Sequence, residues 1–260
     1  MSLSFQIIAS GSKGNAILVC SPRTNLLVDA GLSAKELSRR LERTPVPAAR
    51  LDALILSHEH GDHVRGAGVL SRRFQMPVYL SHGTLENLPV QIGPLDSPQL
   101  FQSGSPFRVG DLEVHPFSIS HDAQDPVGFL VEHDGVRMGI CTDLGIVTQL
   151  VRTRLQGCRG LVIEANHDMD LLLNGPYPWE LKQRIRSRQG HLSNSDAFEL
   201  LDTLHHDGLR VVVFAHLSEI NNRPDLVRDG SNRFFHEEQW QDVEFEIGNQ
   251  HEISRVIELS

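Results

Sequence analysis

Short apolar runs near the start of the chain are separated by turn-forming residues. Residues 5–9, 16–20 and 26–29 are rich in aliphatic side chains, and Gly, Ser, Pro and Asn lie between them. Runs of this length and spacing predict short strands joined by turns. Residues 33–42 predict a helix instead, because their leucines recur at near-helical spacing and the serine that begins the segment is a good N-cap.

Strand and helix patterns alternate along the rest of the chain. The predicted strands are residues 54–56, 78–80, 112–117, 127–132, 136–142, 161–163 and 211–214, and the predicted helices are residues 66–74, 146–156, 179–188 and 193–205. Asp134 and Gly135 predict a hairpin turn. Residues 89–106 are rich in proline and predict a loop, whereas residues 228–238 suit either a loop or an oligomer contact.

This order of elements predicts the fold class. Two rounds of strands and helices, with no linker-like stretch between them, predict an α/β fold with two sheets packed face to face and helices outside. That arrangement is a four-layer αββα sandwich. We expect one domain over residues 1–260, since chains of this length routinely form one domain with a sizeable core.

The composition is that of an ordinary globular protein. Hydrophobic residues make up 40% and charged residues 22% of the 260 positions. No apolar run approaches the roughly 20 residues of a membrane span, and the first residues lack the pattern of a signal peptide. We therefore expect a cytoplasmic protein that makes no membrane contact.

The cysteines, the net charge and the histidines reduce the number of possible functions. Cys20, Cys141 and Cys158 are an odd number without C-x-x-C spacing, so no structural disulfide is expected. The net charge of −9 argues against an extended electrostatic grip on nucleic acid, because neutralising phosphates calls for a basic face. The 14 histidines favour a metal site without locating it.

The strongest chemical signal is the sequence Ser-His-Glu-His-Gly-Asp-His at residues 57–63. It places four ligand-type side chains directly after a predicted strand: His58, His60, Asp62 and His63. In an extended segment the first two histidines point to one side, whereas a turn at the glycine aims the last two ligands at a second ion. We therefore predict a site for two divalent metal ions.

Four side chains cannot complete two coordination spheres and still leave room for water. Other ligand-type residues follow predicted strands further along the chain: His121, Asp143 and His216. Histidine and carboxylate ligands favour zinc, and they also suit manganese or iron. The predicted cofactors are thus two divalent metal ions, zinc first.

The order of these residues resembles the metallo-β-lactamase superfamily, which has a histidine cluster, a later histidine, an aspartate and a final histidine. The resemblance covers nearly the whole chain and implies the metallo-β-lactamase fold. It implies two groups of ligands and a bridge: His58, His60 and His121; Asp62, His63 and His216; and Asp143 between the two ions. It also matches Asp29, in Leu-Val-Asp-Ala-Gly, to a residue that braces the ligand loop without binding metal.

Further segments resemble the YycJ/WalJ subgroup, whose relatives include PhnP-like phosphodiesterases and tRNase Z. These segments are residues 10–15 (Ser-Gly-Ser-Lys-Gly-Asn), 121–123 with 125–128, and 164–168 (Glu-Ala-Asn-His-Asp). The resemblance implies a 5′-to-3′ exonuclease that acts on double-stranded DNA. DNA is therefore the predicted partner, although neither composition nor spacing points to it.

The resemblance also implies catalytic roles. Two metal ions activate a shared water against phosphorus, and Asp62 and Asp143 act within that centre. His191 resembles the general acid of phosphodiesterases in this superfamily, which protonates the leaving oxygen. The alternative for His191 is a structural place ahead of the helix that Ser193 caps.

Several polar residues are candidates for substrate contacts. Ser12 and Asn15 belong to a glycine-rich loop whose backbone donors could cradle a phosphate, although such a loop is often only a turn. Asn166 and His167 either line the site or form a polar strand end. The basic residues of helix 179–188 either contact a phosphate backbone or form a solvated face.

Two other interpretations remain open. The same metal centre can activate water against a carbonyl carbon, so the chain could instead hydrolyse a cyclic phosphodiester, a thioester or a lactone. The acidic net charge favours such a small substrate. The second alternative is a non-enzymatic metal-binding or redox module. The sequence does not predict an oligomeric state.

Overall fold

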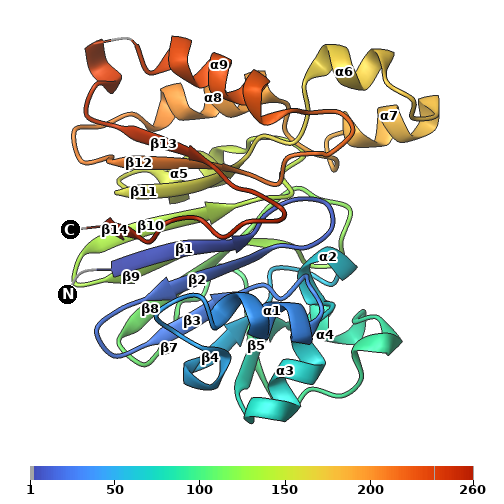
Figure 1. Cartoon of the computed structure of the whole chain (residues 1–260), viewed down its shortest axis with the longest axis vertical. Helices are drawn as coiled ribbons and strands as arrows, with labels where there is room; N and C mark the ends of the chain where they lie inside the picture. The colour runs from blue at the N-terminus through green and yellow to red at the C-terminus, as the bar shows by residue number, and fades with distance from the viewer. Residues whose placement is uncertain (1–2, 237, 260) are drawn as a thin grey trace.

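The structure of the chain, a computed structural model, describes residues 3–236 and 238–259 and contains two seven-stranded sheets (Figure 1). The first sheet has the order β14-β1-β2-β3-β4-β5-β6, with β1 Leu3–Ala9, β2 Ala16–Cys20, β3 Asn25–Val28, β4 Ala53–Ile55, β5 Pro77–Ser81, β6 Ser97–Phe101 and β14 Ile257–Leu259. The second has the order β13-β12-β11-β10-β9-β8-β7, with β7 Phe107–Val109, β8 Leu112–Ser118, β9 Val127–His133, β10 Val136–Cys141, β11 Gly160–Glu164, β12 Val211–Ala215 and β13 Glu244–Ile247.

Helices lie on both outer faces of this pair of sheets. Those that follow strands of the first sheet are α1 Ala34–Leu41, α2 Gly61–Val64, α3 Ala67–Phe74 and α4 His82–Glu86. Those of the second half are α5 Gln149–Leu155, α6 Met169–Asn174, α7 Trp179–Ile185, α8 Asn194–Leu204 and α9 Pro224–Phe234. Short 3-10 helices span Ala48–Arg50, Val90–Ile92 and Glu238–Trp240. The predicted αββα sandwich is confirmed, and α2, α4, α6 and α7 lie at one edge of it, on the right in Figure 1.

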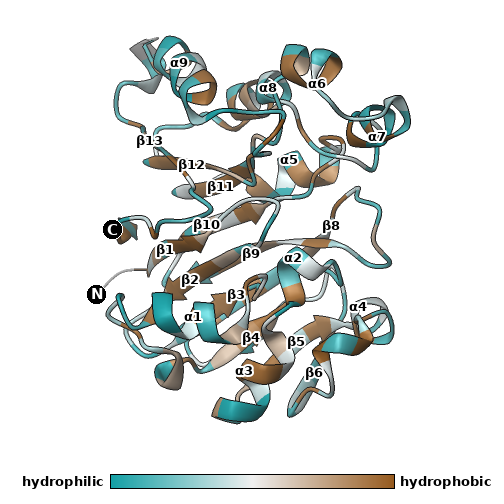
Figure 2. Cartoon of the chain, turned by 45° about the vertical axis from the view of Figure 1, so that its right-hand side comes forward, coloured by the Kyte–Doolittle hydropathy of each residue, from teal (hydrophilic) through white to brown (hydrophobic). Residues whose placement is uncertain are grey.

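Apolar side chains fill the space between the sheets and the space under the helices. The central core includes Phe5 and Val28 from the first sheet and Phe129 and Val213 from the second. Leu27, next to Val28 in β3, instead packs in the outer core that α1 and α3 cover. A strand buried on both faces needs a continuous apolar run, which explains the runs in the sequence and the brown strands of Figure 2.

Local signals in the sequence fix several element ends. The Ser33 side chain accepts a hydrogen bond from Glu36 N at the start of α1. Ser193 and Asp196 form a capping box at the start of α8. The predicted β9–β10 hairpin is also confirmed, and Asp134 at its turn has the left-handed φ of +48° that tight hairpin turns require.

The prediction of a loop over residues 89–106 was wrong. This stretch contains the 3-10 helix Val90–Ile92 and strand β6, Ser97–Phe101, which pairs in parallel with β5 at the edge of the first sheet. An edge strand tolerates Pro98, because one side of it needs no ladder hydrogen bonds. The prolines of this stretch therefore do not exclude a strand.

Residues 228–238 begin as helix, because α9 continues to Phe234. Phe234 and Phe235 then contact the buried ring of Trp240, so these aromatic residues pack within the molecule. Residue 237 lies outside the described part of the chain. Two predicted helices are shorter than expected: α5 begins only at Gln149, and α7 ends at Ile185.

The segment between β13 and β14 crosses from the second sheet to the first. Gln250 in this segment accepts a hydrogen bond from Lys13 N at 2.8 Å and donates one to Gly14 O at 2.9 Å. Beyond it, β14 pairs antiparallel with β1 at the edge of the first sheet. A residue near the end of the sequence, Gln250, thus fixes the glycine-rich loop between β1 and β2.

Within residues 3–236 and 238–259, no helix combines the length and the apolar character that crossing a bilayer requires. Cys20, Cys141 and Cys158 are free thiols. The expectation that the chain lacks a signal peptide rests partly on Met1 and Ser2, which lie outside the described residues, and it stays a prediction.

Candidate metal centre

Polar residues stand at or just beyond the carboxyl ends of five strands. β3 and β4 are parallel neighbours in the first sheet, and β10, β11 and β12 are parallel neighbours in the second. The polar residues at these ends are Asp29, His58, Asp143, Glu164 and His216. Because the carboxyl ends of parallel strands meet at one edge of a sheet, both sheets deliver ligand-type side chains to the same edge of the sandwich.

Three of these residues have left-handed backbone. The φ angle is +61° at Asp29, +57° at Asp143 and +56° at His216. For a residue other than glycine such a conformation costs of order 1–3 kcal/mol and persists only where the surroundings enforce it. Strained residues of this kind cluster at functional sites, and here three of them meet at one edge.

Three histidines form the first group of ligand atoms. His58 and His60 come from the loop between β4 and α2, and His121 follows β8. The His60 Nδ1 atom lies 3.2 Å from His121 Nε2. His58 Nε2 is buried with no hydrogen-bond partner among the described residues. The ligand atoms of all three lie within 4.8 Å of one another, which suits one divalent ion bound by imidazole nitrogens.

Asp62, His63 and His216 form the second group, whose ligand atoms also lie within 4.8 Å of one another. Asp62 Oδ2 is 3.3 Å from His216 Nε2 and 3.6 Å from His63 Nε2. A carboxylate with two imidazole nitrogens is again a donor set that a divalent ion such as zinc accepts. The chain thus offers two separate sets of donors that fit metal ions.

Asp143 lies between the two groups. Its Oδ2 atom is 3.1 Å from His63 Nε2, and its Oδ1 atom is 3.7 Å from His121 Nε2. Burial opposes ionisation of this carboxyl, but the neighbouring His216 and His63 rings hold its pKa well below the usual range. An ionised carboxylate therefore reaches one member of each group.

Carboxylates behind the ligands orient two of the imidazole rings. His63 Nδ1 donates a hydrogen bond to Asp29 Oδ2 at 2.8 Å, and His216 Nδ1 donates one to Glu164 Oε1 at 2.7 Å. Each bond fixes the ring and leaves its Nε2 atom for an ion. Asp29 also accepts hydrogen bonds from the backbone N–H and the hydroxyl of Ser57, at 2.8 and 2.9 Å, so it holds the start of the ligand loop.

Glu164 belongs to the predicted 164–168 segment but was not predicted to have a role in the site. Its side chain is fully buried, and it accepts hydrogen bonds from His191 Nδ1 and His216 Nδ1 and from the backbone N–H groups of Leu144 and Leu192. Burial alone would raise its pKa, but the two histidines outweigh that effect and lower the pKa to about 2. The available signal was a carboxylate at the end of an apolar strand, as for Asp143.

We expect the substitution Glu164→Gln to weaken metal binding or activity by about 10-fold to 100-fold, the usual effect of losing such a partner. The amide keeps the size of the side chain, but it has only one acceptor oxygen and no charge to fix the two imidazole rings. Calorimetric titration with zinc measures the affinity. Glu199→Gln, an exposed change on α8, is the matched control; equal affinities in both variants would contradict an orienting role.

His191 follows α7 and faces the same edge. Its Nδ1 donates to Glu164 Oε1 at 2.8 Å, and its side chain is 22% exposed. Burial lowers the pKa of this imidazole, but the Glu164 carboxylate more than compensates and raises it above its ordinary value. His191 is therefore placed to carry a proton at the edge of the cavity.

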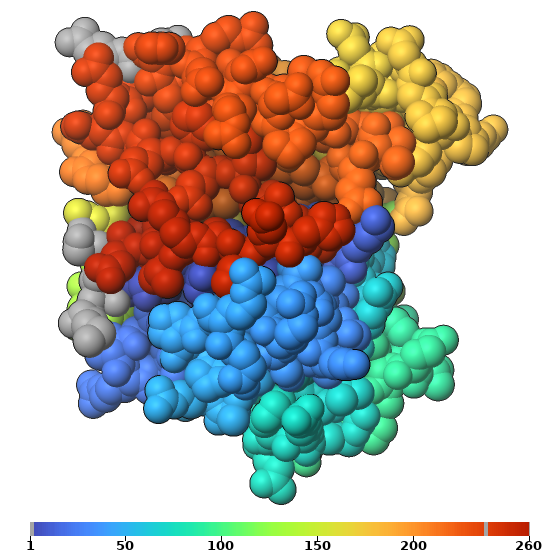
Figure 3. All heavy atoms as spheres, in the orientation of Figure 1, coloured from blue at the N-terminus to red at the C-terminus, as the bar shows by residue number. Residues whose placement is uncertain are grey.

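An open cavity of about 330 Å³ gives access to these side chains. Its lining includes Ser12, Asp62, Asp143, His191 and His216. Figure 3 shows the molecule hollowed on its right side, between the gold α6–α7 segment and the blue and green segments of the first half. Solvent and a substrate can therefore reach both groups of ligands.

The four predicted substrate-binding residues occupy different places. Ser12 is exposed and lines the metal cavity, and Asn166 lines an adjoining pocket. Asn15 is buried, with its Nδ2 atom 3.1 Å from His63 Nε2. His167 is also buried and is not among the residues that line either cavity.

The glycine-rich loop is largely satisfied by the protein itself. The backbone N–H groups at positions 10, 11, 13, 14 and 15 bond to protein acceptors, namely Asn249 O, Asn15 Oδ1, Gln250 Oε1, Gly11 O and Asp62 O. The loop therefore does not present a row of free backbone donors for a phosphate. Its hydrogen bonds instead connect the ligand loop to the segment before β14.

Only part of the basic run in and after α7 faces solvent. Lys182 Nζ donates to Leu173 O and Gly175 O, both at 2.8 Å, and so caps the end of α6. Arg184 Nε pairs with Asp122 at 2.6 Å beside the metal cavity. Arg186 and Arg188 are exposed. Two of the four basic residues are thus already engaged.

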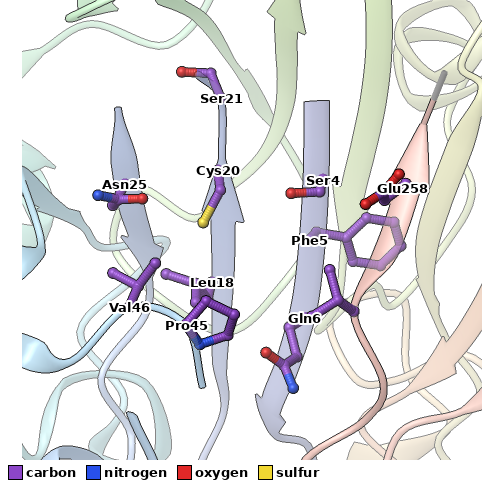
Figure 4. Close-up of a pocket in the computed structure, with 11 residues that line it drawn as sticks. Ser4, Phe5, Gln6, Leu18, Cys20, Ser21, Asn25, Pro45, Val46 and Glu258 are labelled. Atoms are coloured by element: carbon purple, nitrogen blue, oxygen red, sulfur yellow. The ribbon is translucent and has the colours of Figure 1, made fainter. Parts of the chain in front are cut away.

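A separate cavity of about 300 Å³ lies on the outer face of the first sheet, away from the ligands. Figure 4 shows Gln6 and Cys20 on adjacent strands with Pro45 and Val46 beside them. Burial raises the pKa of the Cys20 thiol to about 11, further helped by the charge of Asp52. This cavity therefore lacks a reactive thiolate at neutral pH.

An αββα sandwich with histidine and carboxylate donors converging at one edge defines a class, the metal-dependent hydrolases of the metallo-β-lactamase fold. Residues 24–217 match the family described as Beta-lactamase superfamily domain. The chain belongs to the β-lactamase superfamily, as the order of its ligand residues predicted.

Within that superfamily the chain is similar to two exonucleases. It is 36% identical over 230 residues to Exodeoxyribonuclease YycJ of Bacillus anthracis. The aligned residues cover 88% of this chain and 87% of that protein. It is 37% identical over 227 residues to Exodeoxyribonuclease WalJ of Streptococcus pneumoniae serotype 2 (strain D39). These residues cover 85% of this chain and 84% of that protein. The structure of YhfI from Bacillus subtilis, a metallo-β-lactamase fold protein, matches with a TM-score of 0.74 at 18% identity over 98% of this chain and 100% of that one. It shows the shared fold.

Proposed function

We propose that residues 1–260 form a single-domain, two-metal phosphodiesterase that degrades DNA from a strand end. The observation that carries this proposal is the convergence of two donor groups on either side of Asp143, with His191 held beside them by Glu164. His58, His60 and His121 would hold one ion, and Asp62, His63 and His216 the other. Nitrogen and oxygen donors without sulfur favour zinc and also suit manganese or iron.

Two bound divalent ions would lower the pKa of a shared water and neutralise charge on the phosphoryl oxygens. Asp143 would fix their separation, since it reaches both groups: Oδ2 lies 3.1 Å from His63 Nε2, and Oδ1 lies 3.7 Å from His121 Nε2 and 3.3 Å from His216 Nδ1. Asp62 is partly exposed in the cavity and would orient the attacking water by accepting its hydrogen bond. His191 would donate its proton to the leaving oxygen, while Glu164 keeps its ring in place.

The DNA substrate is supported by similarity to the YycJ and WalJ exodeoxyribonucleases at 36% and 37% identity. The 5′-to-3′ polarity is what the resemblance to the YycJ/WalJ subgroup implies. The net charge of −9 does not favour an extended contact with DNA. A substrate held mainly at its end needs fewer phosphate contacts, and the metal ions themselves supply positive charge where the scissile phosphate lies. Terminal cleavage is therefore compatible with an acidic protein.

The acidic charge also favours a second candidate, a hydrolase for a small phosphodiester. The two functions share one metal centre and differ in the size of the substrate. The first test is metal-supplemented turnover of 5′-labelled duplex DNA beside bis(p-nitrophenyl) phosphate, for the wild type and the His60→Ala variant. We expect the wild type to cleave both substrates and the variant, which lacks one imidazole ligand, to lose both activities.

His82→Ala is the matched control, because this histidine is exposed on α4, where it pairs with Glu86, and it belongs to neither donor group. It should retain both activities. Cleavage of bis(p-nitrophenyl) phosphate alone would support the small-substrate enzyme and reject the DNA substrate. Failure to cleave either compound with zinc, manganese or iron present would reject the phosphodiesterase.

A further inference from the structure

A second pocket opens beside the metal cavity. It has a volume of about 180 Å³, and the α6–α7 segment contributes Tyr177, Leu181 and Ile185 to its lining. We infer that this pocket binds the terminal nucleoside of the DNA strand, with the Tyr177 ring packed against the base. This inference rests on the proposed function and adds a substrate-recognition site to it.

The pocket is continuous with the metal cavity. Ser12, Asp122, Arg184 and His191 line both of them. The Arg184–Asp122 ion pair joins α7 to the loop after β8 at this shared boundary. A ligand whose phosphate lies among the metal ligands can therefore extend directly into the pocket, past His191. The pocket lies on the side of the proposed general acid, so it receives the nucleoside whose oxygen leaves.

The chemistry of the pocket suits a planar heteroaromatic base. Tyr177, Leu181 and Ile185 are half-buried and provide an apolar wall. Asn166 and Ser218, both buried, are polar residues of the lining, and each side chain also bonds to the protein backbone. Small-ligand pockets combine apolar walls with a few placed polar groups in this manner, and base–aromatic stacking tolerates any base because each has a π-face.

Tyr177 differs from the other large aromatic residues in its contacts with the described part of the chain. The chain has 2 tyrosines and 2 tryptophans. Tyr79 stacks on Phe107, and the buried Trp240 packs against the partly buried rings of Phe234 and Phe235. In contrast, within the described ranges Tyr177 makes neither a ring contact nor a hydrogen bond. Its side chain is thus available to a ligand at the mouth of the metal centre.

Trp179 provides a matched comparison on the same segment. It begins α7 two positions after Tyr177 and is 55% exposed. It is not among the residues that line the pocket. A general aromatic or apolar attraction of this segment for DNA would involve both rings, whereas a nucleoside pocket requires Tyr177 alone.

The test compares two 3′-labelled duplexes that are identical except at the 5′ end, where one carries thymidine and the other an abasic tetrahydrofuran residue. We expect the wild type to cleave the thymidine end about 5-fold to 100-fold faster, the range that stacking of one base provides. Tyr177→Ala should reduce this preference to near 1, chiefly through a higher KM. Tyr177→Phe keeps the ring and should keep the preference, and so should Trp179→Ala.

Direct binding gives a second measurement. Calorimetric titration with thymidine should give a weaker affinity for Tyr177→Ala than for Tyr177→Phe, by the same factor. Equal cleavage of the two ends by the wild type, or a preference that survives in Tyr177→Ala, would overturn the pocket assignment while the nuclease stands. Loss of the preference in Trp179→Ala would also overturn it. A wild type that cleaves neither duplex would overturn the proposed function and the pocket together.

Discussion

Replacing Asp143 by Ala is expected to lower phosphodiester hydrolysis by about 1,000-fold or more, equivalent to about 4 kcal/mol of lost transition-state stabilisation. Within residues 3–236 and 238–259, Asp143 is the one carboxylate that reaches a member of each donor group, at 3.1 Å from His63 and 3.7 Å from His121. Under the proposed function Asp143 would set the separation of the two ions, and the substitution removes that ligand. Steady-state turnover of bis(p-nitrophenyl) phosphate measures the rate, and elemental analysis of the purified protein measures the metal content.

The fold should survive this substitution, because the sheets are held by the apolar cores and Asp143 lies at their edge. Circular dichroism checks that point. The Asp143→Asn variant keeps the volume of the side chain. A loss of activity in this variant therefore cannot be explained by a cavity at position 143. Asp202→Ala, an exposed change on α8, should behave as the wild type. Turnover within a few-fold of wild type in either Asp143 variant would rule out the bridging role.

His191→Ala should lower the rate by about 100-fold to 10,000-fold on diesters with poor leaving groups, the usual effect of removing a general acid. The loss should be much smaller with bis(p-nitrophenyl) phosphate, because p-nitrophenolate leaves without needing a proton. Both metal ions should remain bound, since His191 belongs to neither donor group. Parallel assays of DNA and the nitrophenyl ester measure the contrast.

The contrast between leaving groups separates acid catalysis from a structural effect. His191 also contacts Glu164, so its removal could disturb His216. Such a disturbance would slow both substrates equally and lower the metal content. His251→Ala, at an exposed position, is the matched control. If the variant lost the same factor in rate on both substrates, His191 would not be the general acid. It would then be a residue that positions its neighbours.

The candidate metal centre could be proposed from the sequence because four of its potential donor residues are close together in the chain. His58, His60, Asp62 and His63 lie in one loop, and their alternation indicates metal binding before any tertiary contact is known. The other predicted ligands follow recognisable strands. The structure brings all of them to one edge, because neighbouring parallel strands end together.

The partners behind the ligands could not be predicted in the same way. Glu164 accepts from a ring 52 positions away in the sequence, at His216, and the two meet only because β11 and β12 pair in register. Asn15 meets His63 across a similar separation. Local patterns contain no information about which strands are neighbours. Short elements were missed for a related reason, since α6 and β14 have too few residues for a periodic pattern.

The pairing of β14 with β1 has a consequence for the synthesis of this protein on the ribosome. β1 begins at residue 3, whereas its partner at the edge of the sheet ends at residue 259. At about 5–20 residues per second, roughly 10–50 seconds separate their appearance. During that interval the edge of β1 has no strand beside it, and such edges invite aggregation. Since Gln250 also emerges late, we expect the glycine-rich loop beside the candidate metal centre to become ordered only after residue 250 has been synthesised.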